Sequence, residues 1–166
     1  MLPPIGWMND PNGFVYFHGE YHLFYQFYPY DSVWGPMHWG HAKSKDLLHW
    51  EELPVALAPS ESYDKDGCFS GSAIVKDDKL YLLYTGHVDD EEKREETQCL
   101  AVSTDGITFE KIPTNPVIHS HHIEGIADIA DFVILKYLNT KEAITLSLLL
   151  RHRMREVKFS YLHQVI

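Results

Sequence analysis

The sequence is poor in cysteine, poor in basic residues relative to acidic ones, and free of long apolar runs. Its two cysteines, Cys68 and Cys99, form no metal-like pair and cannot build a disulfide framework, so we expect reduced thiols in the core. Lys and Arg number 14 against 24 Asp and Glu, a net charge of −10 that argues against nucleic acid or an anionic membrane as partner. The longest apolar stretch, residues 143–150, is far shorter than the ~20 residues of a membrane span, and no signal-peptide pattern opens the chain. We expect a soluble protein with no membrane partner.

What the sequence does contain points to an all-β fold. With 166 residues and 45% hydrophobic content, the chain is long enough for a domain with a core. Runs rich in Tyr, Phe, Val and Leu predict strands at residues 14–17, 21–27, 72–75 and 80–84. Polar turn residues separate these runs in pairs, which predicts two hairpins and an antiparallel sheet.

An internal repeat shows how the strands are organised. Residues 42–54 return as residues 101–113, each beginning Ala-x-Ser-x-Asp and ending in Pro, at an offset of about 59 residues. The hairpin near Gly13 returns near Gly71 at about the same offset. Four-stranded antiparallel units at a regular period are typical of propeller blades. The period predicts that a third blade begins near residues 130–132.

The densest group of turn residues surrounds one carboxylate, Asp10, between Asn9 and Pro11. Composition alone allows Asp10 to be an ordinary turn residue, since Asn-Asp-Pro and Asn-Gly are common turn sequences. Several further motifs follow in order along the chain: Tyr25-Gln26, Trp34-Gly35, His38-Trp39-Gly40-His41-Ala42 and Cys68-Phe69-Ser70-Gly71-Ser72.

Together these motifs, from residue 2 to about residue 118, resemble glycoside hydrolase family 32, the family of invertases, sucrose-6-phosphate hydrolases, levanases and inulinases. The resemblance implies a partial five-bladed β-propeller, with residues 1–132 as the amino-terminal part of the catalytic domain. It implies a β-fructofuranosidase that removes terminal fructosyl units from sucrose, sucrose phosphate or fructans with retention, with no cofactor and no metal.

The resemblance also assigns roles to individual residues. Asp10 would be the nucleophile that attacks the anomeric carbon and forms a covalent fructosyl-enzyme. Amide, hydroxyl and aromatic groups would line the fructose pocket, bonding the sugar hydroxyls and packing against the ring. These residues are Asn9, Gln26, Trp34, Phe69 and Ser70. A purely structural role stays open for the two aromatic residues.

Two motifs that the family chemistry needs are absent from the sequence. A retaining site needs an acid/base carboxylate about 5–5.5 Å from the nucleophile, which the family carries in a Glu-Cys pair, and the family's Arg-Asp-Pro motif braces the fructosyl hydroxyls. Neither motif occurs in this sequence. Losing the acid/base group typically removes ~10²–10⁴-fold of rate, so we expect this chain to be weakly active or inactive. A non-catalytic fructan-binding remnant and a fructosyltransferase are the alternatives.

Residues 133–166 are a mixture of Leu, Arg and His without turn punctuation or family resemblance, and propensity predicts an irregular or helical tail. Loss of one base at the Phe132 codon would account for this tail. Residues 132–136 back-translate to codons that, regrouped by one base, read Arg-Asp-Pro-Lys. A diverged terminal segment is the alternative. The start is expected to be clipped, because Met1 falls inside the family's opening strand. A genuine start would mean a cytoplasmic protein, and a clipped one leaves secretion open.

Two other polar groups carry weaker hypotheses. His119, His121 and His122 have no carboxylates grouped around them in the sequence, so we expect no metal site there. The acidic run at residues 89–96 is expected to be a solvated loop.

Overall fold

The computed structural model describes residues 5–90, 93–119, 129–140, 143–152 and 157–163, with the backbone alone at residue 93 and from 129 onward. Among these residues every regular element is a β-strand, so the all-β prediction is confirmed, and no helix is long and apolar enough to cross a membrane. The strands are β1 (Trp7–Phe17), β2 (Glu20–Tyr28), β3 (His38–Ser44), β4 (Glu51–Leu57), β5 (Gly67–Lys76), β6 (Lys79–Asp90), β7 (Lys93–Ser103), β8 (Glu110–Lys111), β9 (Ile118–His119), β10 (Ile129–Thr140), β11 (Ala143–His152) and β12 (Val157–His163).

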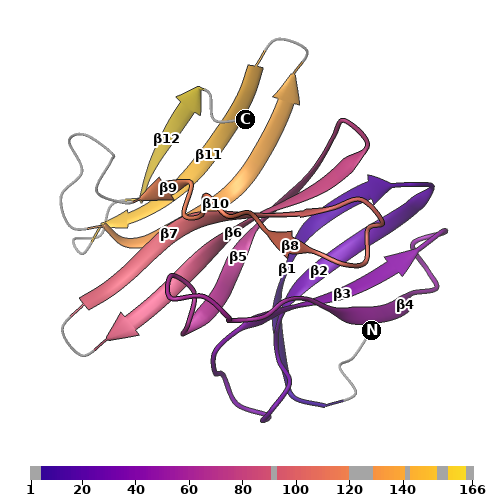
Figure 1. Ribbon diagram of the computed structural model, residues 1–166, viewed down its shortest axis with the longest axis horizontal. Coiled ribbons are helices and arrows are strands. Elements are labelled where there is room, and N and C mark those ends of the chain that lie inside the picture. The colour runs from indigo at the N-terminus through magenta and orange to yellow at the C-terminus, as the bar shows by residue number, and fades with distance from the viewer. Residues whose placement is uncertain (1–4, 91–92, 120–128, 141–142, 153–156, 164–166) are drawn as a thin grey trace.

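The strands form three antiparallel sheets that follow one another along the chain (Figure 1). The first has the order β1-β2-β3-β4, the second β5-β6-β7-β8 with β9 paired to β7, and the third β10-β11-β12. The second sheet lies between the other two in Figure 1, and its strand β5 contacts both β1 and β10. Consecutive meanders packed in this way are the arrangement that the sequence repeat predicts.

Both predicted hairpins are confirmed, and both have tight two-residue turns. His18 and Gly19 have φ values of 47° and 86°, and Asp77 and Asp78 have φ values of 50° and 57°. Two successive positive φ angles are the mark of a type I′ turn, whose twist matches that of the flanking strands. The two tips also touch, since Nε2 of His18 lies 2.9 Å from Oδ1 of Asp78.

The repeated Ser-x-Asp segments form the same turn in the first two sheets. In the first sheet the Ser44 hydroxyl accepts a hydrogen bond from the backbone N–H of Leu47 at 2.9 Å. In the second, Ser103 accepts one from Gly106 at 2.8 Å. The aspartate of each segment accepts two backbone N–H groups further on. Short polar side chains that bond the following backbone stabilise such turns, which explains why the pattern recurs.

The core lies between the first two sheets. Trp39 and Tyr84 are fully buried and belong to one apolar cluster that draws on both sheets. Full burial of a large side chain contributes roughly 1.5–3 kcal/mol, so this cluster is the main cohesion between the sheets. Cys68 and Cys99 are free and buried in it, which confirms the prediction of reduced core thiols, and burial raises the pKa of Cys99 to about 11.

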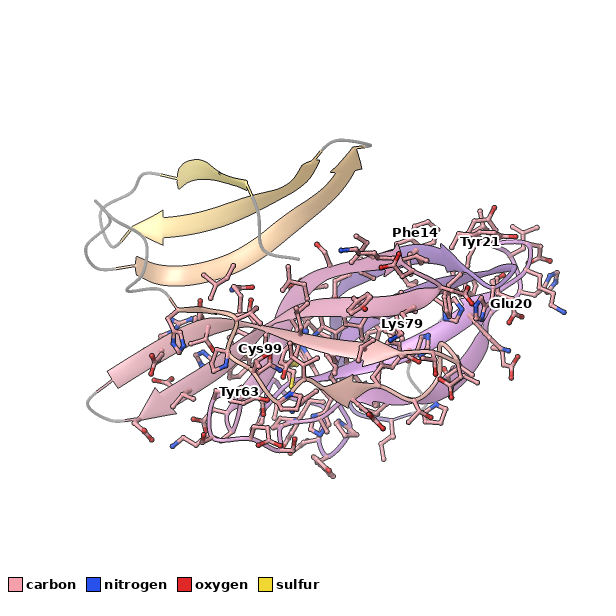
Figure 2. All side chains as sticks on the ribbon, turned by 45° about the horizontal axis from the view of Figure 1, so that its top comes forward. Phe14, Glu20, Tyr21, Tyr63, Lys79 and Cys99 are labelled. Atoms are coloured by element: carbon pink, nitrogen blue, oxygen red, sulfur yellow. The ribbon has the colours of Figure 1, made fainter. Side chains whose placement is uncertain are left out.

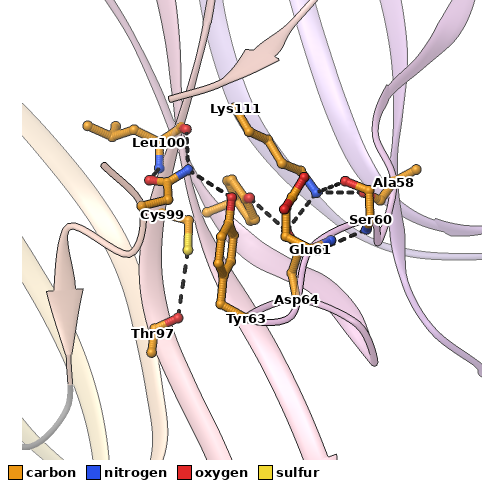
Figure 3. A network of polar contacts seen from close by, with 11 residues as sticks. Ala58, Ser60, Glu61, Tyr63, Asp64, Thr97, Cys99, Leu100 and Lys111 are labelled. Atoms are coloured by element: carbon orange, nitrogen blue, oxygen red, sulfur yellow. Dashed lines mark hydrogen bonds and ion pairs between the residues drawn. The ribbon is translucent and has the colours of Figure 1, made fainter. Parts of the chain in front are cut away.

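A buried polar network fastens the segment between the first two sheets (Figure 3). The Asp64 side chain is fully buried and accepts hydrogen bonds from Lys111 Nζ at 2.6 Å and from the Tyr84 hydroxyl at 2.8 Å. Its other oxygen accepts the backbone N–H groups of Ser60 and Glu61. A buried carboxylate with this many donors is compensated for its loss of water.

The expectation of an irregular or helical tail is wrong, because the structure has three paired strands there. β10 begins at Ile129, close to where the period predicts a third blade. Antiparallel partners on both sides of β11 override a local helical preference, and Val, Ile, Thr, Tyr and Phe in β10 and β12 suit strands.

The acidic run is also organised differently from the expected solvated loop. Its described residues belong to β6 and β7, with Asp89 paired to Arg94 and His87 to Glu96. Glu96 is only 5% exposed. A cross-strand register in a well-paired hairpin decides which side chain of an acidic run is buried, and the composition of the run does not contain that information.

Candidate active site

The candidate nucleophile Asp10 lies at a β-bulge. On β1, Asn9 pairs with Gln26 and Pro11 pairs with Tyr25, so that Asp10 is an extra residue without a partner on β2. Its φ of 24° is unusual for a residue with a side chain, and Asp10 is exposed. Bulges re-aim a side chain away from the regular pleat and are common beside active sites.

Ser70 lies at a second bulge, in the corresponding first strand of the second sheet. The register of β5 against β6 shifts between Phe69 and Ser72. Gly71 is required within this shift, since a Cβ there would lie 1.9 Å from the carbonyl oxygen of Leu83. The two bulges meet, because the Ser70 hydroxyl donates a hydrogen bond to Oδ2 of Asp10 at 3.2 Å. Two residues 60 positions apart in the sequence are thus in contact, and their roles in a fructose pocket stay predictions.

Trp34 and Phe69 form an aromatic pair beside this contact. Their ring centroids are 6.0 Å apart with an interplanar angle of 69°, an edge-to-face arrangement. Trp34 lies in the segment between β2 and β3 and is 56% exposed, whereas Phe69 is half-buried on β5. An exposed indole offers a face on which a sugar ring can pack.

Two contacts fix the segment that carries Trp34. The ring of Tyr28 covers Gly35, where a Cβ would lie 2.6 Å from the Tyr28 ring. His38 donates from Nδ1 to the carbonyl oxygen of Pro36 at 2.9 Å. Burial lowers the pKa of His38, so that its imidazole stays neutral near pH 7.

Asn9 and Gln26 are placed side by side, but both already have protein partners. Asn9 Oδ1 accepts a hydrogen bond from Trp7 Nε1 at 2.8 Å. Gln26 is 3% exposed, and its amide nitrogen donates to the carbonyl oxygen of Cys68 at 3.0 Å. The structure therefore gives Gln26 a contact that ties β2 to the start of β5, next to the predicted pocket.

Several residues to which the sequence analysis gave no role in the pocket also hold this site. Trp39 Nε1 donates to the carbonyl oxygen of Phe69 at 3.1 Å, and Thr85 donates to that of Ser70 at 3.2 Å. His87 stacks on the ring of Phe69. Trp39 belongs to the motif at residues 38–42, but no local pattern shows that these three residues contact Phe69 and Ser70, because they lie on other strands.

The described residues contain no group of three or more His, Cys, Asp or Glu that could hold a metal ion. His121 and His122 lie outside the described residues, so the hypothesis about that histidine group stays a prediction.

The family model for the Glycosyl hydrolases family 32 N-terminal domain matches residues 1–146. The chain belongs to glycosyl hydrolase family 32. The family assignment inferred from the motifs is confirmed. The match ends at residue 146, and the division of the chain at residue 132 stays a prediction.

Known members of family 32 show how much of such a protein this chain represents. A sucrose-6-phosphate hydrolase of Zymomonas mobilis is 62% identical over 115 residues, which cover 67% of this chain and 22% of that protein. The chain therefore spans about a fifth of the length of this curated relative.

Solved family 32 structures confirm the partial five-bladed propeller. The structure of sucrose-6-phosphate hydrolase from Lactobacillus gasseri matches with a TM-score of 0.84 at 32% identity, covering 96% of this chain and 32% of that one. A sucrose complex of a Bombyx mori family 32 β-fructofuranosidase mutant matches with a TM-score of 0.70 at 44% identity, covering 95% and 35%.

Proposed function

We propose that this chain carries part of the fructosyl-binding site of a retaining β-fructofuranosidase, with Asp10 as the nucleophile. The observation that carries the proposal is the meeting of two bulges, which sets the Asp10 carboxylate against the Ser70 hydroxyl at 3.2 Å on an exposed surface. A carboxylate suits this role because the transition state at the anomeric carbon resembles an oxocarbenium ion. The substrate would be sucrose, sucrose phosphate or a fructan.

In a complete site of this kind Asp10 attacks the anomeric carbon as the bond from that carbon to the glycosidic oxygen breaks, and an acid/base carboxylate protonates the departing alcohol. Water, deprotonated by the same carboxylate, then hydrolyses the fructosyl ester and frees Asp10. The Ser70 hydroxyl, donating to Oδ2, orients the carboxylate and leaves Oδ1 to attack. The edge-to-face pair of Trp34 and Phe69 supplies the apolar wall of the pocket. Water could be activated only by an acid/base carboxylate, for which the family uses the Glu-Cys pair absent from this sequence.

The missing pair favours a second candidate, in which the chain binds fructosyl units without turning them over. Both hypotheses predict that fructose binds, and they differ in the expected rate of sucrose hydrolysis. We expect the chain to bind fructose but to release glucose from sucrose ~10²–10⁴-fold more slowly than an intact enzyme.

The test uses the 166-residue chain. Titration calorimetry measures fructose binding, and a second assay measures glucose release from sucrose. Trp34→Ala should weaken fructose binding by about tenfold, the value of a lost aromatic contact. Tyr16→Ala is the matched control, since Tyr16 is 57% exposed, like Trp34 at 56%, and follows the bulge on β1. Equal effects of both substitutions would overturn the pocket assignment, and ordinary enzyme rates would overturn the expected inactivity.

The frame-slip hypothesis is tested on the DNA. Sequencing across the Phe132 codon and reading all three frames should show Arg-Asp-Pro and, further on, Glu-Cys after one added base. A gene with that base restored should then give a protein that hydrolyses sucrose, and Asp10→Asn in it should lower kcat by at least about 10³-fold. Absence of both motifs in every frame would refute the slip and favour the non-catalytic reading.

A further inference from the structure

The ring of Phe69 rests on a buried histidine that the proposed chemistry does not use. The imidazole of His87 stacks on the phenyl ring with centroids 4.1 Å apart and an interplanar angle of 16°. His87 is 3% exposed and lies on β6 opposite Gly67, two residue pairs along from Thr85, which pairs with Phe69. Phe69 therefore contacts two rings, the imidazole of His87 and the indole of Trp34.

His87 is itself backed by a buried carboxylate on the next strand. Nδ1 of His87 lies 3.5 Å from Oε1 of Glu96, which is 5% exposed. The same oxygen accepts a hydrogen bond from Arg94 at 2.9 Å. Among the described residues Nδ1 accepts or donates no hydrogen bond, so Glu96 limits rotation of the imidazole only by packing against it.

The backbone beneath Phe69 is fixed by other groups, which leaves its ring orientation to His87. Side chains of Gln26, Trp39 and Thr85 donate to the carbonyl oxygens of residues 68, 69 and 70 respectively. Gly67, the cross-strand partner of His87, makes room for the ring, since a Cβ there would lie 2.7 Å from Cε1 of Phe69. The phenyl ring therefore lies over a glycine and against the imidazole.

We propose that His87, packed against Glu96, is a positioning residue of the fructosyl pocket, which sets the ring of Phe69 and through it the indole of Trp34. The inference rests on the proposed function for its consequence in sugar binding. His87 does not touch the sugar in this proposal. It acts through the stacked ring, so a flat aromatic side chain can replace it and a small one cannot.

The test compares His87→Ala with His87→Phe in the full chain. The alanine variant should weaken fructose binding by at least about fivefold, whereas the phenylalanine variant, which keeps the stack, should stay within about twofold of the parent. His18→Ala is the matched control, because His18 also stacks on a phenyl ring, that of Phe17 at 3.8 Å and 20°, but on a distant hairpin tip. It should leave the affinity unchanged.

A second readout needs no ligand. It is the quenching of Trp34 fluorescence by acrylamide, obtained by subtracting the fluorescence of the Trp34→Phe variant. In His87→Ala this quenching should increase to the level of Phe69→Ala. In His87→Phe it should stay at the level of the parent chain. Unchanged quenching in a folded His87→Ala variant would overturn the proposal, as would equal losses in His87→Phe and His87→Ala. If the parent chain binds no fructose, the proposed function fails while the quenching result still decides the role of His87.

Discussion

At the scale of single residues, the two repeated turns differ at one position, which is Leu47 in the first turn and Gly106 in the second. The two residues occupy equivalent places after Ser-x-Asp, with φ values of 66° and 72°. A left-handed conformation costs a residue with a side chain roughly 1–2 kcal/mol, and one turn accepts that cost while the other uses glycine. The difference is explained by packing, because Gly106 is buried whereas Leu47 is exposed.

We expect Gly106→Ala to lower the free energy of unfolding by about 2 kcal/mol, from backbone strain and from overpacking. A Cβ there would lie 3.0 Å from Phe17 and 3.2 Å from His22. Urea unfolding measures the change. Leu47→Gly is the matched control, since it relieves the strain and loses only a side chain that is 45% exposed. It should change stability by less than about 0.5 kcal/mol, and a loss as large as that of Gly106→Ala would contradict the explanation.

At the scale of elements, β2 and β3 share a buried histidine pair. Nδ1 of His22 lies 2.9 Å from Nε2 of His41, whose ring stacks on Phe24. Burial, with a smaller contribution from the facing His22, lowers the pKa of His41 to about 3, and burial also lowers that of His22. Both imidazoles are therefore neutral in the folded protein near pH 7, and the contacts between the two strands depend on that state.

This pair predicts a loss of stability in acid. Because the folded pKa of His41 is depressed from 6.5, its contribution is complete above pH 6.5 and is lost as the pH falls toward 3. Between pH 7.5 and 5.0 the chain should lose about 2 kcal/mol of unfolding free energy from His41 alone. Urea unfolding at the two pH values measures this loss.

His41→Phe should reduce that acid loss, while His49→Gln should not. His49 is exposed, and Asp46 raises its pKa, so its protonation in acid favours the folded state. A parent and a His41→Phe variant with the same pH dependence would show that the pair does not titrate on unfolding.

At the scale of the whole molecule, the sheets are held by the core and by the Asp64–Lys111 network, which ties the segment after β4 to β8. Lys111 donates to Asp64, to the carbonyl oxygen of Ala58 and to the Ser60 hydroxyl. The outer face of the first sheet lies apart from this network. Phe14 and Tyr21 stack there at 6.0 Å, with Phe14 57% exposed (Figure 2). An exposed aromatic face of this kind is where a closed propeller would place a neighbouring blade.

We expect Lys111→Met to lower the free energy of unfolding by about 3 kcal/mol, because it leaves the buried Asp64 carboxylate without its cation. Lys43→Met is the control. The Lys43 pair with Glu20 spans 3.1 Å with side chains 20% and 24% exposed, and its loss should cost about 1 kcal/mol or less. Thermal or urea unfolding of both variants gives the comparison, and similar costs would argue against the network as the tie between the sheets.

The sequence by itself determined the family, the all-β class, the two hairpins and the period of the sheets, because turn chemistry and strand alternation are local and the motifs occur in order. It also named Asp10 and Ser70, which the structure brings together. The tertiary structure alone decided that both residues sit at bulges, that Gln26 is buried against Cys68, and that His87 and Glu96 lie behind Phe69. It also showed strands where a helical tail was expected, since pairing between segments outweighs local propensity. Those contacts depend on register and on the packing of one sheet against another, neither of which is written in any short stretch of the chain.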